Sequence, residues 1–132
     1  MLIHNNQIVE LSIADLLSKY KQGQLSVLSF VESSLERIER LDRQGPTLNA
    51  MIAIAKDAQE RANALDRELA DKGSLRPLHG VPIAVKDQIH TKGIRTTHGS
   101  SVYQSFVPQE DASVVASLYK AGALLVGKTN MS

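Results

Sequence analysis

A change of hydrophobic period near residue 75 constrains the fold of this chain most strongly. Before that point, apolar side chains recur every three or four residues, which places them on one face of a helix. From Leu75 to Gly99 this period disappears, and a short β-branched run at residues 81–85 is bracketed by turn residues. Helices followed by short apolar strands predict an α/β architecture with helices packed on a sheet.

Three amphipathic helices are predicted in the first part of the chain. The first begins at Ser12, where the sequence resembles a capping box, and it ends before Gly23. The second begins near Ser26 and ends at the Gln-Gly-Pro sequence of residues 44–46, and the third occupies residues 56–71. We therefore expect this part of the chain to be mainly helical.

Three short apolar segments are candidates for strands. Residues 48–55 suit a strand or the start of a helix, because periodicity cannot decide for so short a run, and we favour the strand. Pro82 restricts the strand at residues 81–85 to an edge of the sheet, or else it occupies the first residues of that strand. Residues 123–126 are aliphatic, as in a strand buried on both faces.

A fourth helix is predicted between the last two strands. Asp111 is a favourable N-cap residue for it, and Gly122 is typical of the position just after a helix. The residues expected on its inner face are Val114, Val115 and Leu118.

Composition excludes several classes of function. Fifteen basic and fourteen acidic residues are interleaved, and the chain has two Phe, three Tyr and no Trp, so neither the basic stripe nor the aromatic platform of a nucleic-acid-binding protein is present. The absence of Cys excludes disulfides and suits a reducing compartment, so we expect a cytoplasmic protein. The longest apolar run, residues 50–55, is far shorter than the ~20 residues of a membrane span, and the opening residues do not resemble a signal peptide.

One segment matches a nucleotide-binding motif by its letters. Residues 122–129 fit the G-x-x-x-x-G-K-[ST] pattern of phosphate-binding loops. Such a loop must follow a strand and open a helix, whereas Gly122 suits the end of a helix and residues 123–126 suit the interior of a strand. We therefore expect no nucleotide to bind there.

The histidines and a pair of serines give weaker signals. The histidines are spaced too irregularly for two ligands on one helical face, so we assign no metal. They are His4, His79, His90 and His98. Ser100 and Ser101 lie near Lys86 in the sequence, but Ser and Gly dominate turns, and we expect these serines to build one.

Lys86 is the most informative charged residue. It directly follows the predicted strand at residues 81–85, so its ammonium group starts at the edge of a buried layer. Desolvation at such a place lowers the pKa of a lysine from about 10.4, which a lysine needs in order to act as a base near neutral pH. An ion pair with the adjacent Asp87 is the structural alternative, and the residues alone leave both open.

Several stretches resemble the amidase signature family in their order and spacing. They are Pro77-Leu-His-Gly-Val-Pro-Ile-Ala-Val-Lys-Asp87, Thr91-Lys-Gly-Ile-Arg-Thr-Thr-His-Gly-Ser100, Asp111-Ala-Ser-Val-Val115 and Ala121-Gly-Ala-Leu-Leu-Val-Gly-Lys-Thr-Asn-Met131. Residues 35–41 and 48–50 are also similar to the amino-terminal helices of that family. The resemblance therefore covers nearly the whole chain.

The resemblance implies a mixed β-sheet covered by helices and a Ser-cisSer-Lys triad that acts on amide bonds without a cofactor or metal. Lys86 matches the lysine of that triad. In this scheme the neutral lysine accepts a proton through the bridging serine, and the second serine attacks the carbonyl carbon, whose oxygen is held by backbone N–H groups. The family's serines follow the Gly-Lys-Thr-Asn-Met segment, where this sequence ends, so Ser100 and Ser101 inherit neither role.

We therefore expect residues 1–132 to be the amino-terminal part of one amidase domain, incomplete at its C-terminus and inactive alone. Residues 12–72 would form its mainly helical part, and residues 75–132 would form the sheet and the active-site segment. A small amide is the expected substrate. The alternatives are the A subunit of a glutamine-dependent tRNA amidotransferase, which needs partner subunits, and a truncated, non-catalytic remnant that binds partners. An exposed sheet edge would offer a route to self-association.

Overall fold

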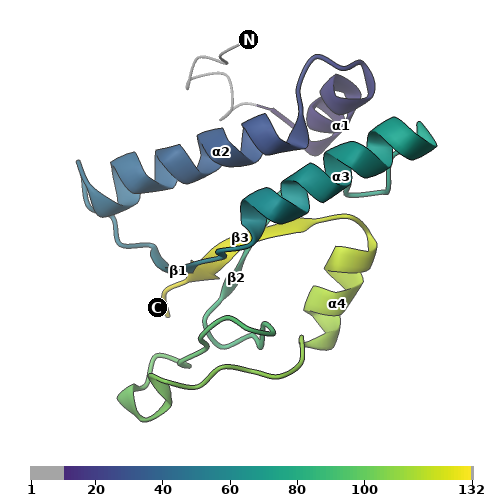
Figure 1. Cartoon of the computed structure of the whole chain (residues 1–132). Helices are drawn as coiled ribbons and strands as arrows, with labels where there is room; N and C mark the ends of the chain where they lie inside the picture. Colours follow the sequence, from purple (N-terminus) through teal and green to yellow (C-terminus); the bar gives the residue numbers. More distant parts are fainter. Residues whose placement is uncertain (1–10, 132) are drawn as a thin grey trace.

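The computed structural model describes residues 11–131, so His4 and the rest of the opening segment lie outside the described part. Helices and strands follow one another along this range (Figure 1). Their bounds are α1 Ile13–Lys21, α2 Val27–Ile38, β1 Met51–Ile54, α3 Ala58–Lys72, β2 Pro82–Lys86, α4 Ser113–Lys120 and β3 Leu124–Thr129. A π-helical turn, Glu39–Arg43, extends α2, and a 3-10 turn, Ser101–Tyr103, lies between β2 and α4. Within residues 11–131, no helix is both long enough and apolar enough to cross a membrane.

The first two helices begin at the predicted serine caps. The hydroxyl of Ser12 accepts a hydrogen bond from the N–H of Asp15 at 3.1 Å, and the hydroxyl of Ser26 accepts one from the N–H of Ser29 at 3.1 Å. Helix α3 ends where Gly73 adopts the left-handed conformation. These boundaries are local, so the sequence is sufficient to predict them.

The start of α2 is also capped by a side chain from another helix. The carboxylate of Asp66, in α3, accepts hydrogen bonds from the N–H groups of Val27 and Leu28 at 2.8 and 3.0 Å. A negative charge at a helix N-terminus also interacts favourably with the helix dipole. Asp66 therefore fixes how α3 packs against the start of α2.

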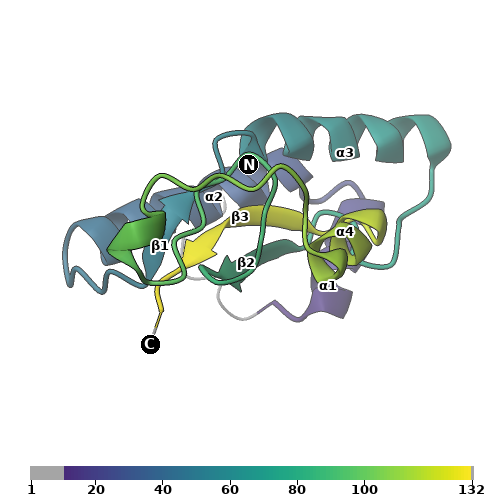
Figure 2. The ribbon, with the colours of Figure 1, turned by 90° about the horizontal axis from the view of Figure 1, so that it is seen from below.

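The three strands form a mixed sheet with β3 in the centre (Figure 2). Strand β3 pairs antiparallel with β1 and parallel with β2. Within the described part of the chain, β2 is an edge strand that begins with Pro82, as expected because proline cannot donate a ladder hydrogen bond. The connection from β2 through α4 to β3 is a β-α-β unit. The predicted α/β architecture is confirmed.

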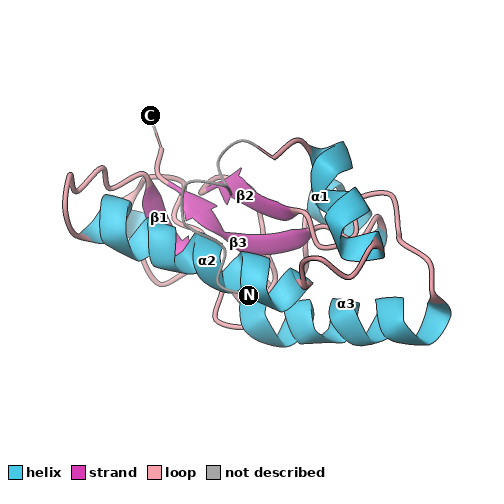
Figure 3. Cartoon of the chain, turned by 90° about the horizontal axis from the view of Figure 1, so that it is seen from above, coloured by secondary structure: helices cyan, strands magenta, loops and turns pink. Residues whose placement is uncertain are grey.

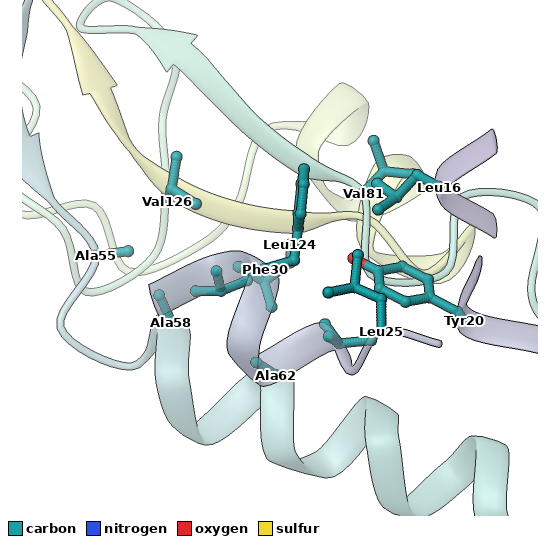
Figure 4. Packing of buried hydrophobic residues seen from close by; sticks show 12 residues of the cluster. Leu16, Tyr20, Leu25, Phe30, Ala55, Ala58, Ala62, Val81, Leu124 and Val126 are labelled. Carbon is teal, nitrogen blue, oxygen red and sulfur yellow. The ribbon is translucent and has the colours of Figure 1, made fainter. Parts of the chain in front are cut away.

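Helices cover both faces of β3. Helices α2 and α3 lie side by side over one face (Figure 3). The larger core cluster lies there and includes Tyr20, Phe30, Ala58, Ala62, Leu124 and Val126 (Figure 4). Helix α4 covers the other face, where Val115 packs with Val85 and Leu125. Strand β3 is therefore buried on both sides, as its aliphatic sequence predicts.

The fourth helix differs from its prediction in two respects. Asp111 does not cap it, because the carboxylate accepts a hydrogen bond from the N–H of Lys92 at 2.7 Å and Ala112 takes the N-cap position. Val114 is not on the inner face, since it is 52% exposed, whereas Val115 is fully buried. A contact with the preceding loop thus overrides the local preference of Asp111 for a cap.

Candidate active site

Lys86 is the last residue of β2, and it is half-buried. The strand therefore includes this lysine, whereas the sequence predicted that it would follow the strand. In the parallel pairing, Lys86 lies opposite Thr129, the last residue of β3. Ligands of open α/β sheets bind beyond the carboxyl ends of parallel strands. Lys86 thus lies at the carboxyl ends of the parallel strands, where a reaction site is expected.

Next to Lys86 lies a buried polar cluster, which we define as Asp87, Thr96, Thr97 and Lys128. One carboxylate oxygen of Asp87, Oδ2, accepts hydrogen bonds from the N–H of Thr97 at 3.1 Å and from its hydroxyl. Lys128 Nζ donates to Thr96 Oγ1 at 2.7 Å and lies 3.7 Å from Asp87 Oδ1. The side chains of Asp87 and Lys128 are both 0% exposed, so this is an interior ion pair. Asp87, which the sequence suggests as an ion-pair partner for Lys86, thus lies within ion-pair distance of Lys128.

Sequence reasoning missed Lys128 as a buried ion. Side chains along a regular strand point alternately to the two faces of the sheet, so strict alternation along β3 would place Lys128 on the face opposite to Leu125. The register between β2 and β3 shifts between Ile83 and Ala84, and this irregularity changes the alternation. Burial lowers the pKa of Lys128 below its usual value, while the carboxylate of Asp87 opposes that effect.

The long segment after β2 holds the two threonines of the cluster in place. It passes over the sheet on the side of α4 (Figures 1 and 2). The N–H of His98 donates to the carbonyl of Asp87 at 3.0 Å, and the N–H of Thr96 donates to the carbonyl of Phe106 at 3.0 Å. The N–H of Asp87 in turn donates to the carbonyl of Thr129 at 3.0 Å. Backbone hydrogen bonds therefore join this segment to the ends of both parallel strands.

The segment with the nucleotide-binding pattern forms a strand, as its context predicted. Residues 127–129 lie within β3 and do not open a helix. Packing explains Gly127, because a Cβ there would lie 2.3 Å from the carbonyl oxygen of Ala53 in β1. Lys128 is buried against Asp87 and Thr96. These positions do not form a cradle for phosphate groups.

The predicted turn at Ser100 and Ser101 is present. The hydroxyl of Ser100 accepts a hydrogen bond from the N–H of Val102 at 3.2 Å and caps the 3-10 turn that begins at Ser101. Because this hydroxyl is used in a cap, the local geometry favours a structural role for Ser100.

The described histidines lie in two different settings. His79 is buried, and its Nε2 lies 3.0 Å from the carbonyl oxygen of Leu65. His90 and His98 are exposed, and their ring centroids lie 5.6 Å apart. Among residues 11–131, no group of three or more His, Asp or Glu side chains is arranged to hold a metal ion.

Comparison with known proteins gives consistent matches. The model of the Amidase family matches residues 29–132. The A subunit of the glutamyl-tRNA(Gln) amidotransferase of an Exiguobacterium species is 46% identical over 119 residues, which are 90% of this chain and 24% of that protein. The native peptide amidase of Stenotrophomonas maltophilia has a TM-score of 0.89 and 41% identity, over 93% of this chain and 25% of that one. An amidase family protein from Bacillus anthracis has a TM-score of 0.90 and 31% identity, over 97% and 25%.

The chain spans about a quarter of the length of these relatives. The family match includes β2, α4 and β3, and therefore Lys86 and the whole buried polar cluster. The shared fold also extends to α1, α2 and α3, since the two structural comparisons cover more than nine-tenths of the chain. This chain belongs to the amidase signature family.

Proposed function

We propose that this chain carries the amino-terminal part of an enzyme that hydrolyses the C–N bond of a small amide, with Lys86 as the base of a Ser-cisSer-Lys triad. The observation that carries the proposal is the position of Lys86. Lys86 is the last residue of β2 and lies at the carboxyl ends of two parallel strands, in the part of the chain that the family match covers. A half-buried amine at such an edge is suited to exchange protons with a bound reactant.

Lys86 would act as a proton acceptor in its neutral form. It takes a proton through the bridging serine from the second serine, whose oxygen then bonds to the carbonyl carbon of the amide. The C–N bond breaks when the nitrogen leaves with a proton, and water then hydrolyses the acyl-enzyme. The family resemblance implies that both serines come from the signature after Met131, so residues 1–132 supply only the lysine.

A hybrid enzyme tests this function. Residues 11–131 would replace the corresponding quarter of the Stenotrophomonas peptide amidase, which has 41% identity and a TM-score of 0.89. We expect the hybrid to hydrolyse the peptide substrate of that amidase and Lys86→Met to abolish the activity. A folded hybrid whose activity does not depend on Lys86 would contradict the proposal.

A second candidate function is that of the A subunit of an amidotransferase, and the identity of 46% to the Exiguobacterium protein favours it. Such a protein would work with partner subunits, whereas a free-standing amidase would not. Purification of the tagged protein from its own cells separates the two functions. Co-purification with tRNA-binding subunits would favour the amidotransferase, and an active enzyme without them would favour the amidase. Either function is compatible with a cytoplasmic location, which we also propose.

A binding role for the 132-residue chain alone would act through its sheet edge. Strand β2 is an edge strand within the described residues, and unpaired edges are templates for association. We propose that the purified chain self-associates through this edge. Sedimentation should then show a concentration-dependent increase in mass, which a proline at Ala84 should reduce. A monomer at all concentrations would contradict this role.

A further inference from the structure

His90 and His98 lie next to each other in the long segment after β2, and the proposed catalytic chemistry uses neither. Their ring centroids are 5.6 Å apart, and both side chains are exposed. Seven residues separate them in the sequence, so the fold of this segment brings the two rings together. Irregular spacing excludes two ligands on one helical face, but these residues lie in a folded loop, where that restriction does not apply.

Backbone hydrogen bonds fix both histidines. The carbonyl of His90 accepts a hydrogen bond from the N–H of Ala112, at the start of α4, at 2.9 Å. The N–H of His98 donates to the carbonyl of the buried Asp87 at 3.0 Å. The two residues are therefore held in place before a ligand binds, which lowers the cost of ordering them.

The separation of the two rings fits a single tetrahedral metal ion. A Zn–N bond of about 2.0 to 2.1 Å puts the centre of a ligating imidazole about 3.2 Å from the ion, so two such rings at a tetrahedral angle have centres about 5.2 Å apart. Adjacent ligands of a square-planar ion would need about 4.5 Å. The observed 5.6 Å is closer to the tetrahedral value, and rotation about the broad χ2 torsion of histidine can remove the remaining difference.

The residues around the pair favour zinc over a hard cation. Residues 88–109 contain no Asp or Glu, so this segment offers imidazole nitrogens and no carboxylate oxygens. Mg²⁺ and Ca²⁺ bind oxygen ligands, whereas imidazole suits Zn²⁺. Lys92 and Arg95 are exposed, so solvent and salt screen their charges. We propose that His90 and His98 together bind one Zn²⁺ ion, with water completing its coordination.

Calorimetric titration of the 132-residue chain with ZnCl₂ tests this site. We expect one ion per chain with a Kd of about 1 to 100 µM, because two protein nitrogens supply half of the ligands of a structural zinc site, and we expect no binding of MgCl₂. His90→Phe keeps an aromatic ring without nitrogens, and His98→Asn suits the left-handed backbone at that residue, where φ is 53°. Each substitution should weaken zinc binding at least about tenfold, since even the loss of an outer-shell partner of a metal ligand costs about that much.

Phe106 provides the matched control, because its ring centroid lies 5.4 Å from that of His90. Phe106→Leu removes this ring contact but no ligand, so its Kd should stay within about threefold of the native value. Three outcomes would overturn the proposal: no zinc binding at about 1 mM, binding that both histidine variants leave unchanged, or an equal loss of binding in Phe106→Leu.

If a histidine variant does not fold, chemical modification of the native chain decides. Diethyl pyrocarbonate modifies free imidazole nitrogens, and peptide mass spectrometry gives the rate at each histidine. At a free zinc concentration of about ten times the Kd, His90 and His98 should react about tenfold more slowly than without zinc. Unchanged rates at these two residues would refute the site. None of these measurements depends on amide hydrolysis.

Discussion

Replacement of Gly127 by alanine should destabilise the sheet through a collision between strands. The added Cβ would lie 2.3 Å from the carbonyl oxygen of Ala53 and 2.7 Å from the terminal carbon of Met51. The Met51 side chain can move, but the carbonyl belongs to the backbone of β1 at the point where Ile54 pairs with Gly127. The two strands must therefore separate by about 1 Å to restore a normal carbon–oxygen contact.

Such overpacking costs about 1 to 3 kcal/mol. The loss of glycine flexibility in the unfolded chain returns about 0.4 to 1 kcal/mol. We expect a net destabilisation of about 1 to 2 kcal/mol, which corresponds to a Tm lower by about 3 to 10 °C for a chain of this size.

Thermal and urea unfolding, followed by circular dichroism, would measure this difference. Adding Met51→Ala to Gly127→Ala should not restore stability, because the clash with the Ala53 carbonyl remains. Gly127→Ala with native stability would refute the close approach of β1 and β3.

Three further predictions concern other parts of the molecule. Asp66→Ala should lower the free energy of unfolding by about 1 to 2 kcal/mol, because the N–H groups of Val27 and Leu28 lose their acceptor. The control Asp71→Ala, at an exposed position, should change the free energy of unfolding little. Equal effects of the two substitutions in urea unfolding would contradict this prediction. The hydrogen bond from Arg76 lowers the pKa of Glu68 from 4.5 to about 2, so the stabilisation of the fold by this pair is present above pH 4.5 and is lost as the pH falls toward 2. The Tm difference between the native chain and Glu68→Gln should therefore shrink over that interval. A constant Tm difference would be inconsistent with this pairing. The 132-residue chain should release no ammonia from acetamide or glutamine in a coupled assay, and turnover that Ser100→Ala abolishes would show that the local Ser-Lys pair is active.

The sequence predicts the features that depend on neighbouring residues. Ser12 and Ser26 cap their helices, and Gly73 ends α3, because each acts on the turn beside it. Pro82 has no N–H group, which predicts that it lies in an edge strand or among the first residues of its strand. Within residues 11–131, β2 is an edge strand and Pro82 is its first residue.

Features that depend on distant contacts could not be predicted in this way. Asp111 has the chemistry of an N-cap residue, but the N–H of Lys92 from the preceding loop takes its carboxylate. Likewise, the pairing of Asp87 with Lys128 requires both the register shift in the sheet and the fold of residues 87–100. The position of Lys86 at the end of a strand could be predicted, because a single apolar run leads directly to it. The ion pair between Asp87 and Lys128 was not, since Lys128 comes from another strand.

The central claim is that Lys86 is the base of an amide-hydrolysing site. The most direct measurement is the rate of product release by the hybrid enzyme that carries residues 11–131, compared between Lys86→Met and the exposed control Lys92→Met. We expect Lys86→Met to lower kcat/KM by at least about 100-fold, the usual contribution of a positioned base, while Lys92→Met stays within about twofold of the parent. A Lys86→Met hybrid that folds normally and keeps the activity of the Lys92→Met control would contradict the claim.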